Sequence, residues 1–165
     1  MKRTLSRRRN DETNNRASRS IRINEGQPII TFFDTEEPIN SYPSISGTHN
    51  GTITPSYNLT VSKLYTYPCE GTGGHTKSIK LYENDTLIAS GVWDEYQGDW
   101  HNITFDGPFS LFAGTDYNYT IKTGSYLQII HAKSKDVTGG TITCTSFVDA
   151  NGKVHTDWIP AIKLY

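Results

Sequence analysis

Methionine is almost absent from this sequence, cysteine occurs only twice, and no apolar run approaches the roughly 20 residues of a membrane-spanning helix. The charged start, Met1-Lys2-Arg3-Thr4, leads into more arginines and not into an apolar segment. We therefore find neither a signal peptide nor a membrane anchor, and we expect any export signal to lie upstream. Helical periodicity over three turns and internal repeats are also absent, which argues against helical and solenoid folds.

Arginine is missing after Arg22. Eight cations against Asp11 and Glu12 give residues 1–22 a net charge of +6, and because the whole chain carries -1, residues 23–165 carry -7. After Met1, only Leu5 and Ala17 are apolar before residue 21, so we expect a disordered basic arm at 1–22 and a folded domain at 23–165. The arm is either a tail that binds nucleic acid or an acidic surface, or a linker.

What the sequence does contain is typical of strands. Tyrosine and threonine are plentiful, and short alternating runs are separated by Gly, Asn, Asp and Pro turn signals such as 84–85, 106–108 and 149–152. The Gly/Thr/Asn-rich segment that ends at Pro55 is interpreted as a loop. We predict an all-β domain, an antiparallel β-sandwich of jelly-roll or immunoglobulin-like kind, with a barrel as the alternative. The predicted strands after that loop are 61–67, 77–82, 86–93, 100–105, 115–123, 126–131, 140–147 and 153–165.

Five Asn-x-Thr triplets are candidate N-glycosylation sites, although chance in a threonine-rich chain also explains some of them. An asparagine that carries a glycan must reach solvent, which fixes the outward face of its strand. Alternation then places Tyr117, Tyr119 and Ile121 inward and Asn118 outward. The triplets begin at Asn50, Asn58, Asn84, Asn102 and Asn118.

The same alternation applied to residues 100–105 places Asn102 outward. It turns His101, Ile103 and Phe105 inward and leaves Trp100 exposed. An exposed tryptophan requires a binding partner.

Cys69 and Cys144 are expected to form a disulfide, because glycosylation triplets and disulfides belong to the same oxidising compartment. The bond would close a loop of about 75 residues and stabilise the domain by on the order of 4 kcal/mol. The alternative is two buried free thiols.

Several longer segments of the sequence are distinctive enough to be compared with known protein families. They are YPSISGTHNGTITP at 42–55, LYTYPC at 64–69, GTGGHT at 71–76, GDWHNITF at 98–105, YNYTI at 117–121, TGSY at 123–126, VDANGK at 148–153 and DWIPAI at 157–162. Together the segments, which span about Phe32 to the end, resemble a β-rich domain of archaeal cell-surface and secreted proteins that has no defined activity. The resemblance implies one exported module of a larger protein, and it does not extend to the arginine-rich arm.

Four aromatic residues near acidic side chains form a candidate carbohydrate site: Tyr82, Trp93, Tyr96 and Trp100, beside Asp94, Glu95 and Asp99. Exposed rings cover the apolar face of a sugar while polar groups bond its hydroxyls. The alternative is that the tryptophans pack in the core. Alternation places Tyr82 outward beside Lys80, with Ile79 and Leu81 inward.

A metal site is a weaker candidate, because none of the five histidines forms a spaced ligand pair. The fold would have to bring together His75, Asp99, His101 and His131, and a histidine that bonds a backbone carbonyl is the commoner arrangement. Calcium near residues 94–99 or at 149–152 is a further alternative, and for 149–152 a hairpin turn is the better explanation. No cofactor is predicted.

No catalytic constellation is evident, so we predict a non-enzyme. The first hypothesis is an extracellular cell-surface module for recognition or assembly that binds a glycan or a protein. The alternatives are a self-assembling subunit of a sheath, filament or shell, and a jelly-roll coat protein whose arm binds nucleic acid.

Overall fold

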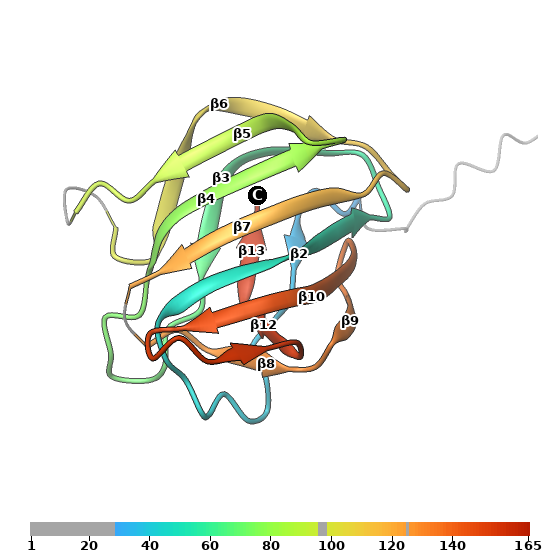
Figure 1. Cartoon of the computed structure of the whole chain (residues 1–165). Helices are drawn as coiled ribbons and strands as arrows, with labels where there is room; N and C mark the ends of the chain where they lie inside the picture. The colour runs from blue at the N-terminus through green and yellow to red at the C-terminus, as the bar shows by residue number, and fades with distance from the viewer. Residues whose placement is uncertain (1–28, 96–98, 125) are drawn as a thin grey trace, which may run out of the picture.

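The computed structural model describes residues 29–95, 99–124 and 126–165, so the predicted basic arm lies outside the described residues. These residues form strands and turns only, and none of them forms a helix long and apolar enough to cross a membrane (Figure 1). The all-β prediction is confirmed. The strands are β1 (Phe33–Asp34), β2 (Gly47–Pro55), β3 (Leu59–Thr66), β4 (Thr76–Glu83), β5 (Thr86–Val92), β6 (Asn102–Leu111), β7 (Tyr117–Thr123), β8 (Ile129–His131), β9 (Ser134–Val137), β10 (Gly140–Asp149), β11 (Val154–His155), β12 (Trp158–Pro160) and β13 (Ile162–Leu164).

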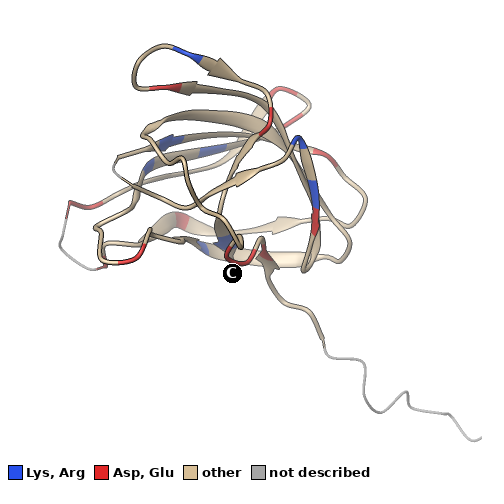
Figure 2. Ribbon diagram, turned by 90° about the horizontal axis from the view of Figure 1, so that it is seen from below, with Lys and Arg blue, Asp and Glu red and all other residues tan. Residues whose placement is uncertain are grey.

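Two antiparallel sheets make up the sandwich. The larger sheet has the order β11-β10-β2-β7-β4-β5, with β9 also paired to β10, and the smaller has the order β1-β13-β3-β6. A short pair, β12-β8, lies at one end (Figure 1). The first and last strands pair with each other, and Figure 2 shows the C-terminus beside the segment where the described N-terminal end leaves the domain.

The core lies between the sheets and follows the predicted alternation. Tyr117, Tyr119 and Ile121 are at most 1% exposed, whereas Asn118 is exposed. On β6, Ile103 and Phe105 are also buried. The predicted faces are therefore confirmed for β7 and for Ile103 and Phe105 of β6, because burying apolar side chains on one face of a strand requires the other face to meet solvent. The inward prediction is wrong for His101, which is half-buried and bonds the Gly74 carbonyl just before β6 begins.

The predicted loop before Pro55 is wrong: this segment is β2, an interior strand between β10 and β7. Its buried positions include His49 and Gly51, which are not the aliphatic residues that announce a strand. Gly51 is required by close packing, since a Cβ there would lie 1.9 Å from the Thr143 carbonyl oxygen and 2.5 Å from the Tyr119 hydroxyl. The Tyr119 hydroxyl crosses this space to donate a hydrogen bond of 2.8 Å to that carbonyl.

The turn predicted at 106–108 is also wrong, because β6 continues to Leu111 with a register shift opposite Val61 and Lys63. β6 is an edge strand, so Pro108 can lie in it without removing an interior ladder bond. By contrast, the turn at 84–85 is confirmed: Asn84 and Asp85 adopt φ of 47° and 63° between β4 and β5.

The predicted disulfide is not formed: Cys69 and Cys144 are free, buried thiols. The Cys69 Sγ donates to the Leu127 carbonyl at 3.4 Å, and Cys144 lies opposite Gly51 within the large sheet. The sequence argument relied on the cellular compartment, whereas bridging requires the two Cβ atoms to face each other at close range.

Two consequences of these buried thiols can be measured. We expect neither cysteine of the folded protein to react with a thiol reagent, because both are at most 3% exposed and burial raises the pKa of Cys144. In denaturant without reductant, both should react. One or no thiol detected under those conditions would contradict the free-cysteine assignment.

Candidate functional site

A row of four side chains crosses the small sheet in register. Asp34 on β1 lies opposite Lys163 on β13, Lys163 opposite Tyr65 on β3, and Tyr65 opposite Asn102 on β6. Their chain neighbours Phe33, Leu164, Leu64 and Ile103 are buried in the core. Because successive side chains of a strand point to opposite faces, these four side chains lie on the face of the small sheet that points away from the core.

Tyrosine rings surround the middle of this row. Tyr65 and Tyr67 meet edge to face with their centroids 5.0 Å apart. With Lys163 and Tyr165 they line a shallow hollow of about 290 Å³. The Lys163 Nζ lies 4.2 Å from the centroid of the Phe32 ring and 5.9 Å from that of Tyr165, so its aliphatic stem and charge are held among rings.

The tryptophans lie beside His75 and Gly73. Trp93 stacks on the His75 ring at 3.9 Å, and Trp100 is tilted against Trp93 with the centroids 6.0 Å apart. A Cβ on Gly73 would lie 3.1 Å from the Trp100 ring, so the indole rests against this backbone. Trp100 nevertheless remains 46% exposed.

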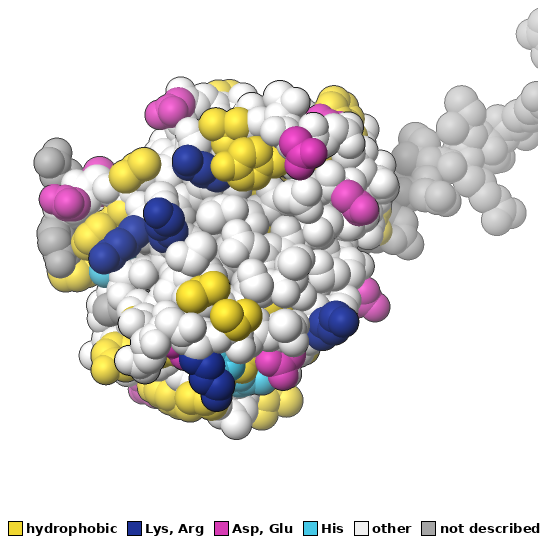
Figure 3. Space-filling model, in the orientation of Figure 1, with side chains coloured by type: hydrophobic (Ala, Val, Ile, Leu, Met, Phe, Trp, Pro, Cys, Tyr) yellow, Lys and Arg dark blue, Asp and Glu magenta, His cyan; other side chains and the backbone are white. Residues whose placement is uncertain are grey.

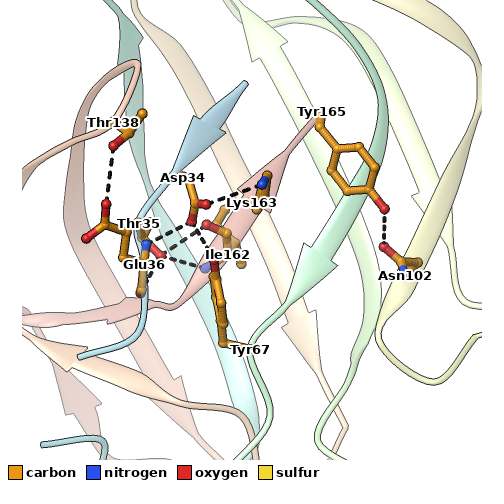
Figure 4. Close-up of polar contacts among 9 residues, drawn as sticks. All are labelled: Asp34, Thr35, Glu36, Tyr67, Asn102, Thr138, Ile162, Lys163 and Tyr165. Atoms are coloured by element: carbon orange, nitrogen blue, oxygen red, sulfur yellow. Dashed lines mark hydrogen bonds and ion pairs between the residues drawn. The ribbon is translucent and has the colours of Figure 1, made fainter. Parts of the chain in front are cut away.

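Asp99, His101 and Asn102 connect the tryptophans to the tyrosines. Asp99 accepts hydrogen bonds from the His101 backbone N–H at 2.9 Å and from the Asn102 amide at 2.5 Å. The Tyr165 hydroxyl donates to the Asn102 Oδ1 at 2.7 Å (Figure 4). The centroid of the His101 ring lies 6.1 Å from that of Tyr65. The backbone hydrogen bond from His101 is the main cause that lowers the pKa of Asp99, so this carboxylate is ionised at neutral pH.

We call this continuous surface the aromatic face. Its members are Tyr65, Tyr67, Trp93, Asp99, Trp100, His101, Asn102, Lys163 and Tyr165.

Comparison with protein-family models and with curated proteins gives no match. The function is therefore argued from geometry.

Two of the four predicted sugar-site residues, Trp93 and Trp100, lie together near Asp99. Trp93 is half-buried and packs against the core, as the alternative for this residue predicted, whereas Trp100 is exposed. Tyr82 lies away from them: the Trp93 N–H bonds the Lys77 carbonyl, and Tyr82 is five residues further along β4, about 16 Å away at the usual strand rise. Tyr96 lies outside the described residues.

The tyrosines of the aromatic face were missed from the sequence. The available signal was the alternation of Tyr65 and Tyr67 within the predicted strand 61–67, which places both rings on one face. Tyr165 joins them only through the pairing of β13 with β3. Pairing between chain segments this far apart cannot be deduced from local patterns.

The structure does not bring the four predicted metal ligands together. His75 bonds the Gly73 carbonyl and His101 bonds the Gly74 carbonyl, both through Nδ1 at 2.9 Å. His131 lies on β8 with its ring edge-on to Trp158 at 4.7 Å. Among residues 29–95, 99–124 and 126–165, no three His, Cys, Asp or Glu side chains are grouped so that they could hold a metal ion.

Residues 149–152 form a hairpin turn between β10 and β11, which the sequence analysis preferred to a calcium site for this segment. Asp149 Oδ1 accepts hydrogen bonds from the N–H groups of Asn151 and Lys153, and Gly152 adopts a φ of 82°. Asp149 also pairs with His155 at 3.0 Å, and this bond is the main cause that lowers the pKa of Asp149.

Two of the glycosylation triplets, those at Asn50 and Asn118, lie on the outer face of the large sheet, on the neighbouring strands β2 and β7. Threonine hydroxyls donate to both: Thr120 to Asn50 at 2.9 Å and Thr52 to Asn118 at 3.1 Å. Figure 3 shows this face as mainly neutral polar with a few lysines. Asn58 and Asn84 are exposed in turns, whereas Asn102 is half-buried in the aromatic face.

Proposed function

We propose that this domain is a non-catalytic recognition module of a cell-surface or secreted protein, and that it binds glycans through the aromatic face. The observation that supports this most is the aromatic face, in which the partly exposed rings of Tyr165 and Trp100 lie beside the hydrogen-bonded Asn102 and Asp99. Tyr165 is 38% and Trp100 is 46% exposed. Exposed apolar side chains that are grouped in one patch, with polar groups at its rim, are typical of binding surfaces.

Sugar recognition requires both parts of this surface. The C–H groups on one side of a pyranose pack on an aromatic ring, and its hydroxyls need donors and acceptors at the rim. Asp99 supplies an ionised acceptor. A second hollow of about 310 Å³ is lined in part by Lys63, Asp99 and Asn102, and Asn102 is hydrogen-bonded to Tyr165 of the first hollow.

The groups of the aromatic face are held before any ligand arrives. Tyr165 is tied to Asn102, Asn102 to Asp99, and Trp93 donates to the Asp99 carbonyl at 3.4 Å. Fixing side chains in advance lowers the entropy lost on binding. A shallow, preorganised surface is suited to an extended oligosaccharide.

The opposite sheet supports a location outside the cell. If Asn50 and Asn118 carry glycans, these project from the large sheet and leave the aromatic face on the small sheet open. The Asn102 Nδ2, to which a glycan would be attached, donates to the Asp99 carboxylate, so we expect this triplet to be unmodified. The resemblance to archaeal surface domains agrees with this arrangement.

An immobilised panel of neutral and acidic oligosaccharides tests the proposal. We expect the protein to bind a subset of the panel, and Trp100→Ala and Tyr165→Ala each to weaken this binding about tenfold, the loss that corresponds to roughly 1.4 kcal/mol of ring contact. Tyr57→Ala is the matched control, because Tyr57 is 49% exposed on the β2–β3 turn, outside the aromatic face. Binding that is unchanged in both test variants, or equally weakened in Tyr57→Ala, would disprove the proposal.

A further inference from the structure

The first and last strands of the described domain bring a lysine and an aspartate together on the outer side of the small sheet. The Lys163 Nζ lies 3.5 Å from the Asp34 Oδ2, and the two side chains are 31% and 11% exposed, respectively. The amine lies near the Phe32 and Tyr165 rings. The Tyr67 hydroxyl contacts the Asp34 carboxylate (Figure 4). This pair is more enclosed than an ordinary surface salt bridge.

Hydrogen-bond donors converge on the other carboxylate oxygen. Asp34 Oδ1 accepts from the Tyr67 hydroxyl at 2.7 Å and from the Glu36 backbone N–H at 2.9 Å. Glu36 presents that N–H from a left-handed conformation, with φ of 58°. Such a conformation is uncommon for a residue other than glycine and is concentrated at functional sites. Two donors on one oxygen are the arrangement that stabilises negative charge developing there during acyl transfer.

We propose that Lys163 and Asp34 condense to an intramolecular isopeptide bond that joins β13 to β1. In this reaction the Nζ–Cγ bond forms and the Cγ–Oδ2 bond breaks. One ammonium proton moves to Oδ2, the neutral amine attacks Cγ, and Oδ1 bears the negative charge between Tyr67 and Glu36. A second proton from Nζ then lets Oδ2 leave as water, so an ammonium and a carboxylate become one amide and one water with no other reactant.

The structure supplies the proximity that this step needs. Proximity is fixed because Thr35 bonds Ile162 through both its backbone N–H and its hydroxyl, which locks β1 beside β13. The product would link the two ends of the described domain, so a force applied between them would not separate these strands.

Intact-mass measurement of the full-length protein in denaturant tests the inference without any sugar ligand, so its outcome is independent of the proposed function. We expect a mass lower than that of the sequence by one water, and tandem mass spectrometry should locate the loss in a cross-linked pair of peptides containing Asp34 and Lys163. Lys163→Arg keeps the positive charge but removes the nucleophilic amine, and it should retain the full mass.

Tyr67→Phe removes one donor from Oδ1 and should slow bond formation about a hundredfold after refolding, a loss typical of one oxyanion donor. A full-mass wild-type protein that is folded by circular dichroism would overturn the proposal. So would a water loss that persists in Lys163→Arg or maps to other residues.

Discussion

Replacing Gly51 with alanine is expected to destabilise the domain by about 3 kcal/mol or more, enough to unfold many small domains. The added methyl would meet the Thr143 carbonyl oxygen at 1.9 Å, in the interior of the large sheet. Relief requires β2 and β10 to separate or Tyr119 to give up its 2.8 Å bond to Thr143. Urea denaturation followed by tryptophan fluorescence measures the change in unfolding free energy.

Gly107→Ala is the control for this prediction. Gly107 also lies in a strand, β6, but a Cβ there would meet no atom within 4 Å. Its substitution should change stability by no more than about 0.5 kcal/mol. Equal effects of the two substitutions would show that β2 does not pack between β7 and β10 as described.

Acid is expected to destabilise the protein through His49. This side chain is fully buried against Phe147, and burial lowers its pKa to about 3, although its bond to the Trp158 carbonyl opposes the shift. The unfolded chain takes up a proton near pH 6.5 while the folded protein does not, so stability is full above pH 6.5 and falls as the pH decreases toward 3. Between pH 7 and pH 4.5 we expect a loss of about 2.5 kcal/mol from this residue.

His49→Asn isolates that contribution. The asparagine amide can replace the Nδ1 donor to Trp158 but does not titrate, so its stability should depend less on pH by about 2.5 kcal/mol over the same range. Its absolute stability will be lower because ring contacts are lost, but the comparison rests on the slope. Measurement above pH 4.5 also limits the contribution of Asp99 and Asp149, whose pKa values are lowered below 3.8. Parallel stability profiles for the two proteins would contradict the assignment.

The fold class could be predicted because most strands have strong alternation. Alternation alone predicts that Tyr117, Tyr119 and Ile121 lie on the buried face of their strand, without any information on the neighbouring strands. β2 could not be recognised, since His49 and Gly51 occupy buried positions for reasons that lie in other strands: the ring stack on Phe147 and the crossing of Tyr119. The continuation of β6 past Gly107 and Pro108 likewise depends on its position at a sheet edge.

The candidate site was predictable only in its local part. Trp93, Asp99 and Trp100 are close in sequence and stay close in space. The tyrosine half of the aromatic face is assembled from β3 and the C-terminal end, and its position next to Asn102 follows from the order β13-β3-β6. Composition and periodicity give no information on that order, which is set by long-range packing.

The most direct test of the central claim, that the aromatic face binds sugar, is amide and indole NMR mapping with an oligosaccharide selected from the panel. We predict saturable shifts at Tyr65, Asn102 and Lys163 and at the Trp100 indole N–H. Thr120 on the outer face of the large sheet and the Trp158 indole should not shift. Shifts confined to Thr120 or Trp158, or no saturable shift with any sugar of the panel, would contradict it.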